Sequence, residues 1–322
     1  MQAPDISLAS TQWRMHDSRM QPRSFRPRRS VLYVPASNAK ALAKLADLAC
    51  DAAIVDLEDA VAPEAKTEAR EAMRRFFAAR RENGGGASPM ELVIRVNALA
   101  SEWGGEDLLA ARACRPDATL LPKVETPRDL LEANDALDEM DAPPGLQLWA
   151  MIETPKALLN IGAIAELGRD RGARLGCFVA GTNDLVKETG VKATPDRRYL
   201  TPWLMQMILA ARAGGIDVLD GVANDFRDLD AFARECAEGA AMGFDGKTLI
   251  HPDQVAPANA AFSPAAEDVA RARAIVAAFA DPANARRGVL TVDGRMTERL
   301  HLAQAEKLLA RAGVTDRQGQ DA

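Results

Sequence analysis

The sequence predicts a (β/α)8 TIM barrel with a C-terminal helical extension, and three observations support this. Short apolar runs alternate with helical patterns from residue 30 to residue 262. The runs are nearly continuous in apolar residues, which is typical of parallel strands covered by helices. The 322 residues, 48% hydrophobic and 27% charged, suffice for one domain of this size with a large core.

Eight apolar runs are candidate strands, and each is followed by a segment of different pattern. They are Ser30–Pro35, Ala52–Leu57, Glu91–Asn97, Thr119–Val124, Leu146–Glu153, Cys177–Gly181, Ile216–Val222 and Lys247–His251. A strand followed by a helix, repeated around eight strands, predicts a closed parallel barrel. The repeat is structural, because no sequence self-similarity accompanies it.

Helical stretches lie between these runs, with apolar residues three and four positions apart. They are Asn38–Cys50, Pro63–Ala79, Pro127–Met140, Pro155–Leu167, Pro195–Ala213 and Asp228–Met242. Thr126 and Thr154 each precede a proline, which predicts a helix N-cap followed by Pro at the first helical position. The glycine-rich residues 84–88 predict a surface turn.

Both ends of the chain extend beyond the predicted catalytic barrel, residues 30–262. Residues 1–29 carry six arginines against two aspartates, which predicts a basic, flexible arm. An organellar transit peptide is also compatible with this composition. Residues 263–322 predict two helices, near 265–280 and 297–312, around a strand–turn at 288–296. This extension or lid would pack on its own barrel or reach a neighbouring subunit.

The charge and the cysteines exclude several classes of protein. The net charge of −6 and pI of about 5.3 argue against broad nucleic-acid binding. No apolar stretch approaches the roughly 18 residues that cross a membrane, and none near Met1 is typical of a secretory signal. Four widely spaced cysteines lack metal-binding spacing and predict buried thiols in a reducing cytoplasm. They are Cys50, Cys114, Cys177 and Cys236.

Polar side chains gather at the predicted C-terminal ends of the strands. In a barrel these ends converge on one mouth, where active sites lie. The residues are Asp56, Glu58, Asp59, Arg95, Asn97, Lys123, Glu125, Glu153, Asp184, Asp220, Asn224, Asp225 and His251. Neighbouring carboxylates repel unless a cation joins them, and Mg²⁺ takes one or two carboxylates with waters and substrate oxygens. Glu153 and Asp184, from adjacent strands, are the expected ligands.

Each of these residues also has a structural alternative. Glu153 stands before Thr-Pro, where a negative charge stabilises a helix N-terminus. Asp184 is compatible with an ordinary turn or cap. Arg95 is compatible with a structural ion pair to Asp56 or Glu58, and we expect Asp56 to be structural. These alternatives remain open from the sequence.

Other catalytic arrangements find little support. The sequence contains neither GxSxG nor a Walker motif, and His16, His251 and His301 lack a credible Ser or Cys partner. His251 is as compatible with a loop anchor as with an acid. Lys123, in LPKVE, is compatible with a Schiff-base aldolase. The carboxylate pair already accounts for the site without a Schiff base.

Ten motifs fall in an order that identifies a family resemblance. They are RRSVLYVP, DLEDAV, VIRVN, LPKVETP, MIETPKALLN, AGTNDL, DFRD, MGFDGKTLIHPDQV, FSP and DGRM. Over about residues 28–312 the chain resembles the citrate lyase β-subunit-like proteins of the HpcH/HpaI aldolase superfamily. This superfamily includes malyl-CoA, β-methylmalyl-CoA and citramalyl-CoA lyases. The resemblance implies a TIM barrel, a homotrimer or hexamer, Mg²⁺ or alternatively Mn²⁺, and a CoA thioester substrate.

The resemblance also implies a role for each matching residue. Glu153 and Asp184 correspond to the metal ligands. Arg95 corresponds to a catalytic, substrate-binding arginine near the thioester carbonyl, and Glu58 to a carboxylate that holds a metal-bound water. The residues implied to line the CoA channel are Arg28, Arg29, Ile250 and Pro252.

Two positions depart from the family pattern. The lyases place an Asp two residues after the Met of DGRM, and a neighbouring subunit's tail supplies it as the acid/base. Here Met296 is followed by Thr297 and Glu298, whose carboxylate sits on one more methylene. A displacement of about 1 Å can cost on the order of 100-fold in rate. The smaller departure is Ala36-Ser37, where the family often has Gly after YVP.

The resemblance therefore implies a carbon–carbon lyase. It would cleave a 3-hydroxyacyl-CoA of the citramalyl-CoA or malyl-CoA type to acetyl-CoA and a 2-oxo acid such as pyruvate or glyoxylate. Three alternatives stay open: a citrate lyase β subunit, a malyl-CoA-type thioesterase, and a catalytically weakened CoA-ester-binding homologue. We expect no nucleic-acid or membrane partner.

Overall fold

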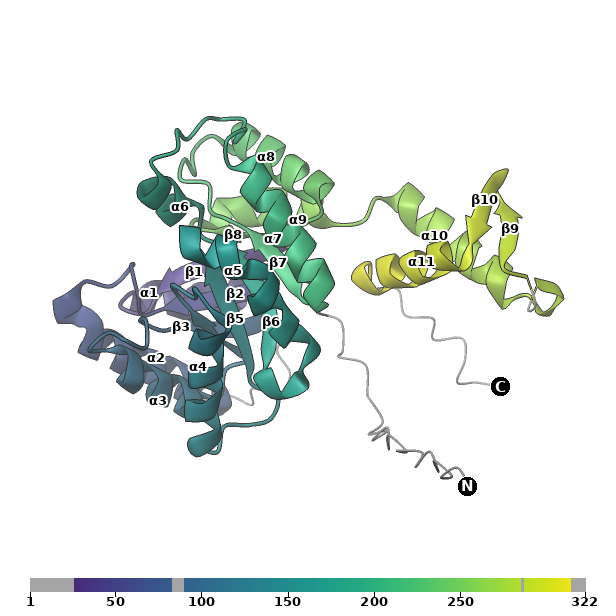
Figure 1. Cartoon of the computed structure of the whole chain (residues 1–322). Helices are drawn as coiled ribbons and strands as arrows, with labels where there is room; N and C mark the ends of the chain where they lie inside the picture. Colours follow the sequence, from purple (N-terminus) through teal and green to yellow (C-terminus); the bar gives the residue numbers. More distant parts are fainter. Residues whose placement is uncertain (1–25, 83–89, 285–286, 314–322) are drawn as a thin grey trace, which may run out of the picture.

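The computed structural model describes residues 26–82, 90–284 and 287–313, and its centre is a closed barrel of parallel strands (Figure 1). The strands follow chain order around the ring, and β1 pairs with both β2 and β8. They are β1 (Ser30–Pro35), β2 (Ala52–Asp56), β3 (Glu91–Arg95), β4 (Ala118–Leu121), β5 (Gln147–Ile152), β6 (Leu175–Ala180), β7 (Asp217–Asp220) and β8 (Gly246–Leu249). The predicted fold class is confirmed.

Helices cover the outside of the barrel. They are α1 (Ala39–Lys44), α2 (Lys66–Glu82), α3 (Gly104–Cys114), α4 (Pro127–Glu139), α5 (Pro155–Glu166), α6 (Thr182–Thr189), α7 (Thr201–Gly214), α8 (Leu229–Met242) and α9 (Val255–Phe262). The predicted caps form, since Thr154 Oγ1 accepts from the Ala157 N–H at 3.0 Å and Asp129 Oδ2 accepts from the Thr126 N–H at 2.8 Å. These caps fix where α4 and α5 begin after their strands.

The helix α3, which begins with two glycines, is not among the helical stretches predicted from the sequence. Glycine pairs usually mark loops. A Cβ at Gly104 would lie 2.3 Å from the Ala98 carbonyl oxygen, so this glycine permits a close approach of two backbone segments. The reason for the glycine is therefore tertiary packing, which no local pattern reveals.

Two apolar layers explain why the strands are almost continuously hydrophobic. Side chains such as Val31, Ile54 and Trp149 fill the barrel interior, and a larger set packs between strands and helices. Burying an aliphatic or aromatic side chain contributes about 1.5–3 kcal/mol before entropy is counted. The strands therefore need apolar residues on both faces, as predicted.

The C-terminal extension forms a separate small core. It contains α10 (Ala266–Ala280), the hairpin β9 (Val289–Val292) and β10 (Arg295–Glu298), and α11 (Arg299–Arg311). Ala272, Ile275, Ala305 and Leu309 are buried against one another. The hairpin turns through Asp293-Gly294, both with positive φ, as a type I′ turn requires. In Figure 1 the extension projects sideways from the barrel.

A salt bridge shows which end of the barrel faces the extension. Arg311 Nη1 lies 3.8 Å from Asp245 Oδ1. Asp245 immediately precedes β8, so this contact is at the N-terminal ends of the strands, which we call the floor. The opposite end, where the strands finish, is the mouth.

The cysteines are as expected: Cys50, Cys114, Cys177 and Cys236 are buried free thiols. No helix within the described ranges combines the length and hydropathy needed to cross a bilayer. Most of the predicted arm at 1–29, the turn at 84–88 and the tail beyond 313 lie outside the described residues.

Candidate active site at the barrel mouth

Arg95, the last residue of β3, is held across the mouth by Asp56, the last residue of β2. Its Nε and Nη2 donate to Asp56 Oδ1 and Oδ2, both at 2.7 Å, and its guanidinium lies 4.9 Å from the centre of the Tyr33 ring. Both charged groups are buried. A bidentate pair fixes the plane of the guanidinium. The structural ion pair considered for Arg95 therefore exists. The remaining nitrogen, Nη1, donates to Met151 Sδ at 3.6 Å and also lies beside Glu58.

Glu58 faces that remaining nitrogen. Its Oε2 lies 2.6 Å from Arg95 Nη1, yet among the described residues this buried oxygen has no aligned hydrogen bond. Burial raises the pKa of Glu58 to about 7, with Arg95 opposing the rise and Asp59, Glu153 and Asp56 adding to it. Near neutral pH the carboxyl is therefore divided between both protonation states, as a group that exchanges protons requires.

Glu153 directly follows β5, and its side chain is only 1% exposed. The neighbouring strand makes room for it, because a Cβ at Gly181 would lie 2.7 Å from Glu153 Oε2. Burial raises the pKa of Glu153; Lys123 opposes this rise and Asp184 adds to it. A carboxylate placed deep in an apolar strand end is costly unless a cation is near.

Asp184 and Lys123 complete this part of the mouth. Asp184 lies in the first turn of α6, and its Oδ1 is 2.6 Å from Lys123 Nζ. The same Nζ is 3.7 Å from Glu153 Oε1, and the Lys123 backbone N–H donates to that oxygen at 2.7 Å. The two predicted metal ligands therefore face one point, and an ammonium stands there.

This arrangement fits a hard divalent cation. No group of three or more His, Cys, Asp or Glu with metal-ligand geometry occurs in the described part of the chain. Two carboxylates with room for waters and substrate oxygens match the preference of Mg²⁺. The Lys123 ammonium, which lies within 4 Å of an oxygen of each carboxylate, shows that the pair already faces a positive charge.

The contacts of Lys123 argue against a Schiff base. Burial lowers the pKa of Lys123, but the hydrogen bond to Asp184 and the charges of Glu153 and Asp184 raise it more, so the net direction is upward. A Schiff-base lysine needs a neutral amine, which a lowered pKa provides. Lys123 has the opposite environment.

The rim beyond β8 carries half-exposed and exposed side chains. Ile250 is 39% exposed, and Pro252 is exposed. His251 anchors its loop, since its Nδ1 accepts from the Asp253 N–H at 3.3 Å, and its ring stacks on Phe226 with centroids 4.8 Å apart. Sequence reasoning missed this aromatic pair because Phe226 and His251 are distant in the chain. The places of Ile250 and Pro252 are compatible with a channel wall.

Asp220 does not belong to the site. Its side chain is fully buried, with Arg197 Nη1 at 2.7 Å and Lys247 Nζ at 3.0 Å from Oδ2. The attraction of these two cations outweighs burial and lowers the pKa of Asp220. This buried network ties β7 to β8 and to the segment before α7, so it stabilises the fold.

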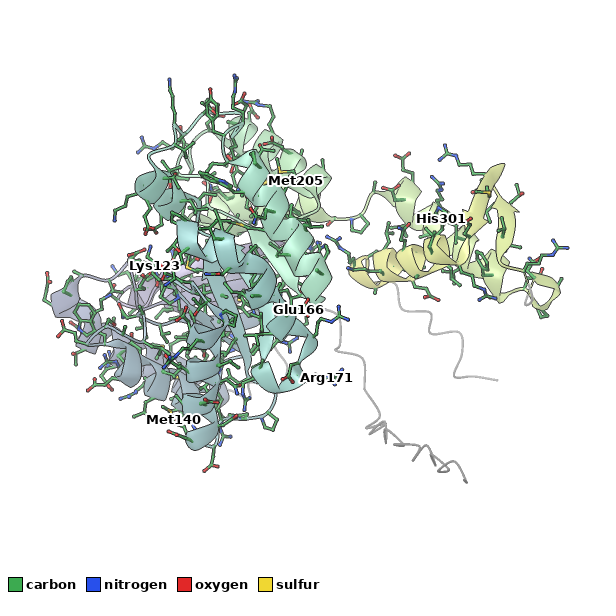
Figure 2. The ribbon with its side chains drawn as sticks, in the orientation of Figure 1. Lys123, Met140, Glu166, Arg171, Met205 and His301 are labelled. Carbon is green, nitrogen blue, oxygen red and sulfur yellow. The ribbon has the colours of Figure 1, made fainter. Side chains whose placement is uncertain are left out.

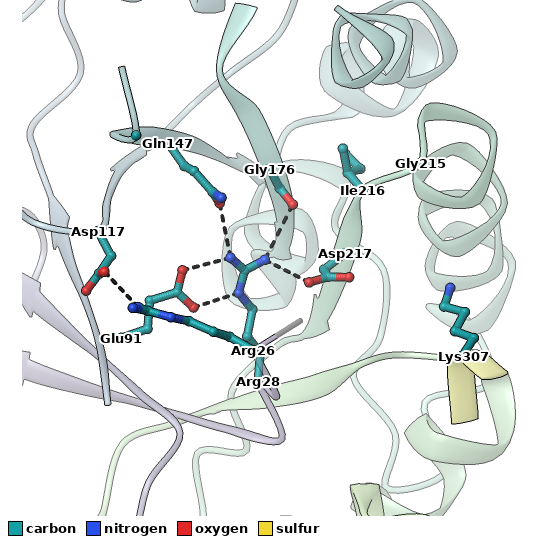
Figure 3. A pocket seen from close by; sticks show the side chains of 11 residues that line it. Arg26, Arg28, Glu91, Asp117, Gln147, Gly176, Gly215, Ile216, Asp217 and Lys307 are labelled. Atoms are coloured by element: carbon teal, nitrogen blue, oxygen red, sulfur yellow. Dashed lines mark hydrogen bonds and ion pairs between the residues drawn. The ribbon is translucent and has the colours of Figure 1, made fainter. Parts of the chain in front are cut away.

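Arg28 and Arg29 require a correction, because their contacts place both of them at the floor, where Figure 3 shows Arg28. Arg28 Nε and Nη2 donate to Glu91, each at 2.7 Å, and Nη1 donates to Asp217 at 2.8 Å. Glu91 and Asp217 are the first residues of β3 and β7. Arg29 is held by Asp51, just before β2, through bonds of 2.7 Å. Neither arginine lines a channel at the mouth of this chain.

Glu298 lies on the extension, where its backbone N–H donates to His301 Nδ1 at 2.9 Å. Figure 2 shows His301 well away from Lys123, which marks the mouth. Within one chain, Glu298 therefore does not join Arg95 and Glu153. Its delivery by a neighbouring subunit remains a prediction.

Comparison with known proteins agrees with this geometry. The HpcH/HpaI aldolase/citrate lyase family matches residues 29–252. A (3S)-malyl-CoA thioesterase from Cereibacter sphaeroides is 44% identical over 286 residues, covering 89% of this chain and 95% of the relative. The human mitochondrial citramalyl-CoA lyase is 32% identical over 318 residues, covering 95% and 92%.

A solved structure gives the same answer for the fold. Protein CitE from Mycobacterium tuberculosis, in complex with magnesium, acetoacetate and coenzyme A, superposes with a TM-score of 0.68 and 30% identity. The match covers 89% of this chain and 98% of that one. The family match over residues 29–252 and these relatives together establish that the chain belongs to the HpcH/HpaI aldolase/citrate lyase family.

Proposed function

We propose that the protein is a Mg²⁺-dependent cytoplasmic enzyme that cleaves a 3-hydroxyacyl-CoA of the malyl-CoA or citramalyl-CoA type. The products are acetyl-CoA and a 2-oxo acid, glyoxylate or pyruvate. The observation that carries the proposal is the convergence of Glu153 and Asp184 on one point, opposite an arginine with one end directed at the site. The CitE complex with magnesium and coenzyme A supports the ligand classes.

Glu153 and Asp184 would hold the metal ion, which supplies Lewis-acid stabilisation of negative charge on a substrate oxygen. In cleavage, the hydroxyl would pass its proton to a carboxylate of the mouth, for which Glu58 is suited by its raised pKa. The bond between the hydroxyl carbon and the acetyl carbon would break, and its electron pair would form the enolate of acetyl-CoA. Arg95, fixed by Asp56, is placed to donate Nη1–H to the enolate oxygen. Loss of one such donor typically costs roughly 10²–10³ in rate.

A protonated Glu298 would donate a proton to the enolate carbon. The extension projects sideways from its own barrel and contacts the floor through Arg311, which supports delivery of Glu298 to the mouth by a second copy of the chain. We therefore propose a homotrimer or hexamer in which each mouth is completed by a neighbour. Mixing Glu298→Ala with Glu153→Gln subunits tests this, because only mixed assemblies would pair an intact mouth with an intact tail.

A second candidate is hydrolysis of the thioester to the free hydroxy acid and CoA. The 44% identity to (3S)-malyl-CoA thioesterases favours it over the 32% identity to the lyase. The presence of Glu298 where the lyases have Asp also favours hydrolysis. The longer side chain would displace the carboxyl group and slow the transfer of a proton to the enolate carbon. The mouth residues serve both reactions, since both develop charge on an oxygen of the same substrate.

The products separate the two candidates. Incubation with (3S)-malyl-CoA or citramalyl-CoA and Mg²⁺ should release a 2-oxo acid, detected as its phenylhydrazone, in amounts equal to acetyl-CoA. Release of free CoA thiol without a 2-oxo acid would show that the enzyme is a thioesterase and not a lyase. Glu153→Gln should reduce either activity by at least about 10³-fold, as removal of a metal ligand implies. Full activity in EDTA, or in this variant, would refute the proposed metal site.

A further inference from the structure

The cation that stands between the two predicted metal ligands belongs to the chain itself. Lys123 Nζ is 2.6 Å from Asp184 Oδ1 and 3.7 Å from Glu153 Oε1. A divalent ion shared by both carboxylates would occupy the space that this ammonium fills. Two cations cannot share that space, so one must leave when the other arrives.

The backbone of Lys123 is fixed, whereas its ammonium lies at the end of a partly exposed, flexible side chain. Its φ of 51° lies in the left-handed region, which non-glycine residues rarely adopt and which is common at functional sites. The N–H donates to Glu153 at 2.7 Å, and the following residue, Val124, is 1% exposed. The side chain is 33% exposed on a flexible four-carbon stem. Nζ is therefore tethered beside the site but able to swing into the mouth.

The position of the Lys123 ammonium affects the electrostatics of the mouth. Glu153 is almost fully buried, and Asp184 shares the same space, so two bare carboxylates would repel. The ammonium neutralises part of this charge while the chain folds without metal. It also opposes metal entry, because an incoming ion must replace its contacts.

We propose that Lys123 is a tethered counter-ion of the metal site, which a divalent cation displaces on binding. The chain thus folds with a partly neutralised mouth and acquires its metal by exchange. The displaced ammonium remains attached at the mouth, near the anionic substrate. This inference rests on the metal site of the proposed function and adds a residue that sets its affinity.

Metal binding tests the proposal without any activity measurement. Mn²⁺ is the probe, and free Mn²⁺ is followed by its electron paramagnetic resonance signal in wild type, Lys123→Met and Lys123→Gln. We expect both variants to bind Mn²⁺ roughly 10- to 1000-fold more tightly, the size of effect that one opposite charge within about 4–6 Å has on a carboxylate's affinity for a proton. In EDTA both should melt at lower temperature than wild type, with a larger rise on adding Mn²⁺.

Lys156→Met is the matched control. Lys156 forms a lysine–glutamate pair with Glu125 at 2.9 Å, and its side chain is 59% exposed. The variant removes the same charge from the same end of the barrel without touching Glu153 or Asp184. If Lys156→Met binds Mn²⁺ with an affinity within about threefold of wild type, the effect of the Lys123 variants comes from the direct contact of Lys123 with the carboxylates and not from the change in net charge.

The outcomes distinguish this inference from the proposed function. If both Lys123 variants bind Mn²⁺ no more tightly than wild type, the proposed exchange is wrong. The metal site is still supported in that case if wild type binds Mn²⁺ and Glu153→Gln does not. An equal gain in Lys156→Met would also overturn the exchange. Absence of Mn²⁺ binding by wild type would refute the metal site itself and the inference with it.

Discussion

The two ends of the barrel both place an arginine among buried carboxylates, but they satisfy it differently. At the floor, Arg28 is fully occupied: Glu91 takes two of its N–H groups, Asp217 another, and Gln147 Oε1 accepts at 3.1 Å (Figure 3). Its guanidinium also lies 4.6 Å from the Trp149 ring centre, which closes the barrel from below. The floor also has a pocket of about 440 Å³, and among the described residues none of the proposed metal ligands lines it.

The mouth carries more carboxylates than cations. Arg95 and Lys123 face five acidic side chains, which are Asp56, Glu58, Asp59, Glu153 and Asp184. One buried oxygen of Glu58 has no hydrogen bond within the described structure, and the pKa values of Glu58 and Glu153 are raised by burial. A saturated network stabilises a fold, whereas an unsaturated one is ready to bind a cation and a substrate.

The largest effect expected from this difference is at the floor. Arg28→Met should destabilise the protein by about 3–5 kcal/mol, because it leaves Glu91 buried without its partner. Turnover per folded molecule should stay within a few-fold of wild type. Arg95→Met should instead lower turnover by roughly 10²–10³. Urea unfolding and steady-state kinetics on both variants provide the measurement, and equal losses of turnover would remove the distinction between the two ends.

A smaller effect should appear in the pH dependence of stability. The pKa of Glu58 is about 7 in the folded protein against an ordinary 4.5, so the folded state binds more protons between these values. Folding stability from Glu58 is therefore complete below about pH 4.5 and falls as the pH rises to 7, by up to about 3 kcal/mol. Glu58→Gln should flatten this fall in EDTA.

Urea unfolding at several pH values between 5 and 8 measures this slope. Glu153, whose pKa is also raised, remains in both proteins, so the slope should decrease rather than vanish. Identical slopes in wild type and Glu58→Gln would show that the mouth does not hold Glu58 protonated, and the contrast with the floor would be weaker.

The sequence predicts the barrel well because its signals are local. Buried parallel strands must be apolar on both faces, so all eight were recognisable, and Thr-Pro pairs marked the starts of α4 and α5. The residues at strand ends could be placed at one mouth for the same reason. Topology alone brings Arg95, Glu153 and Asp184 to the same end of the barrel.

The sequence could not predict contacts that depend on three-dimensional packing. The family resemblance assigned Arg28 to a CoA channel, and no local pattern shows that its guanidinium is buried between Glu91 and Asp217. Neither the left-handed backbone of Lys123 nor the position of its ammonium between two carboxylates is indicated by a local motif. Gly104 resembled a turn signal but serves close packing.

The smallest expected effect separates burial from charge at the floor itself. Arg26 Nη1 pairs with Asp117 Oδ1 at 2.7 Å, but the two side chains are 39% and 37% exposed. Arg26→Gln should cost less than about 1 kcal/mol, since solvent screens such pairs and Asp117 keeps the Leu92 N–H at 2.9 Å. Its effect should shrink in 1 M salt, which shortens the screening length to about 3 Å. Urea unfolding of Arg26→Gln and Arg28→Met, at low salt and in 1 M salt, measures the loss of stability in each variant. Because the two arginines are only two residues apart, an equal loss of stability would mean that burial does not distinguish the Arg28 network from the exposed Arg26 pair.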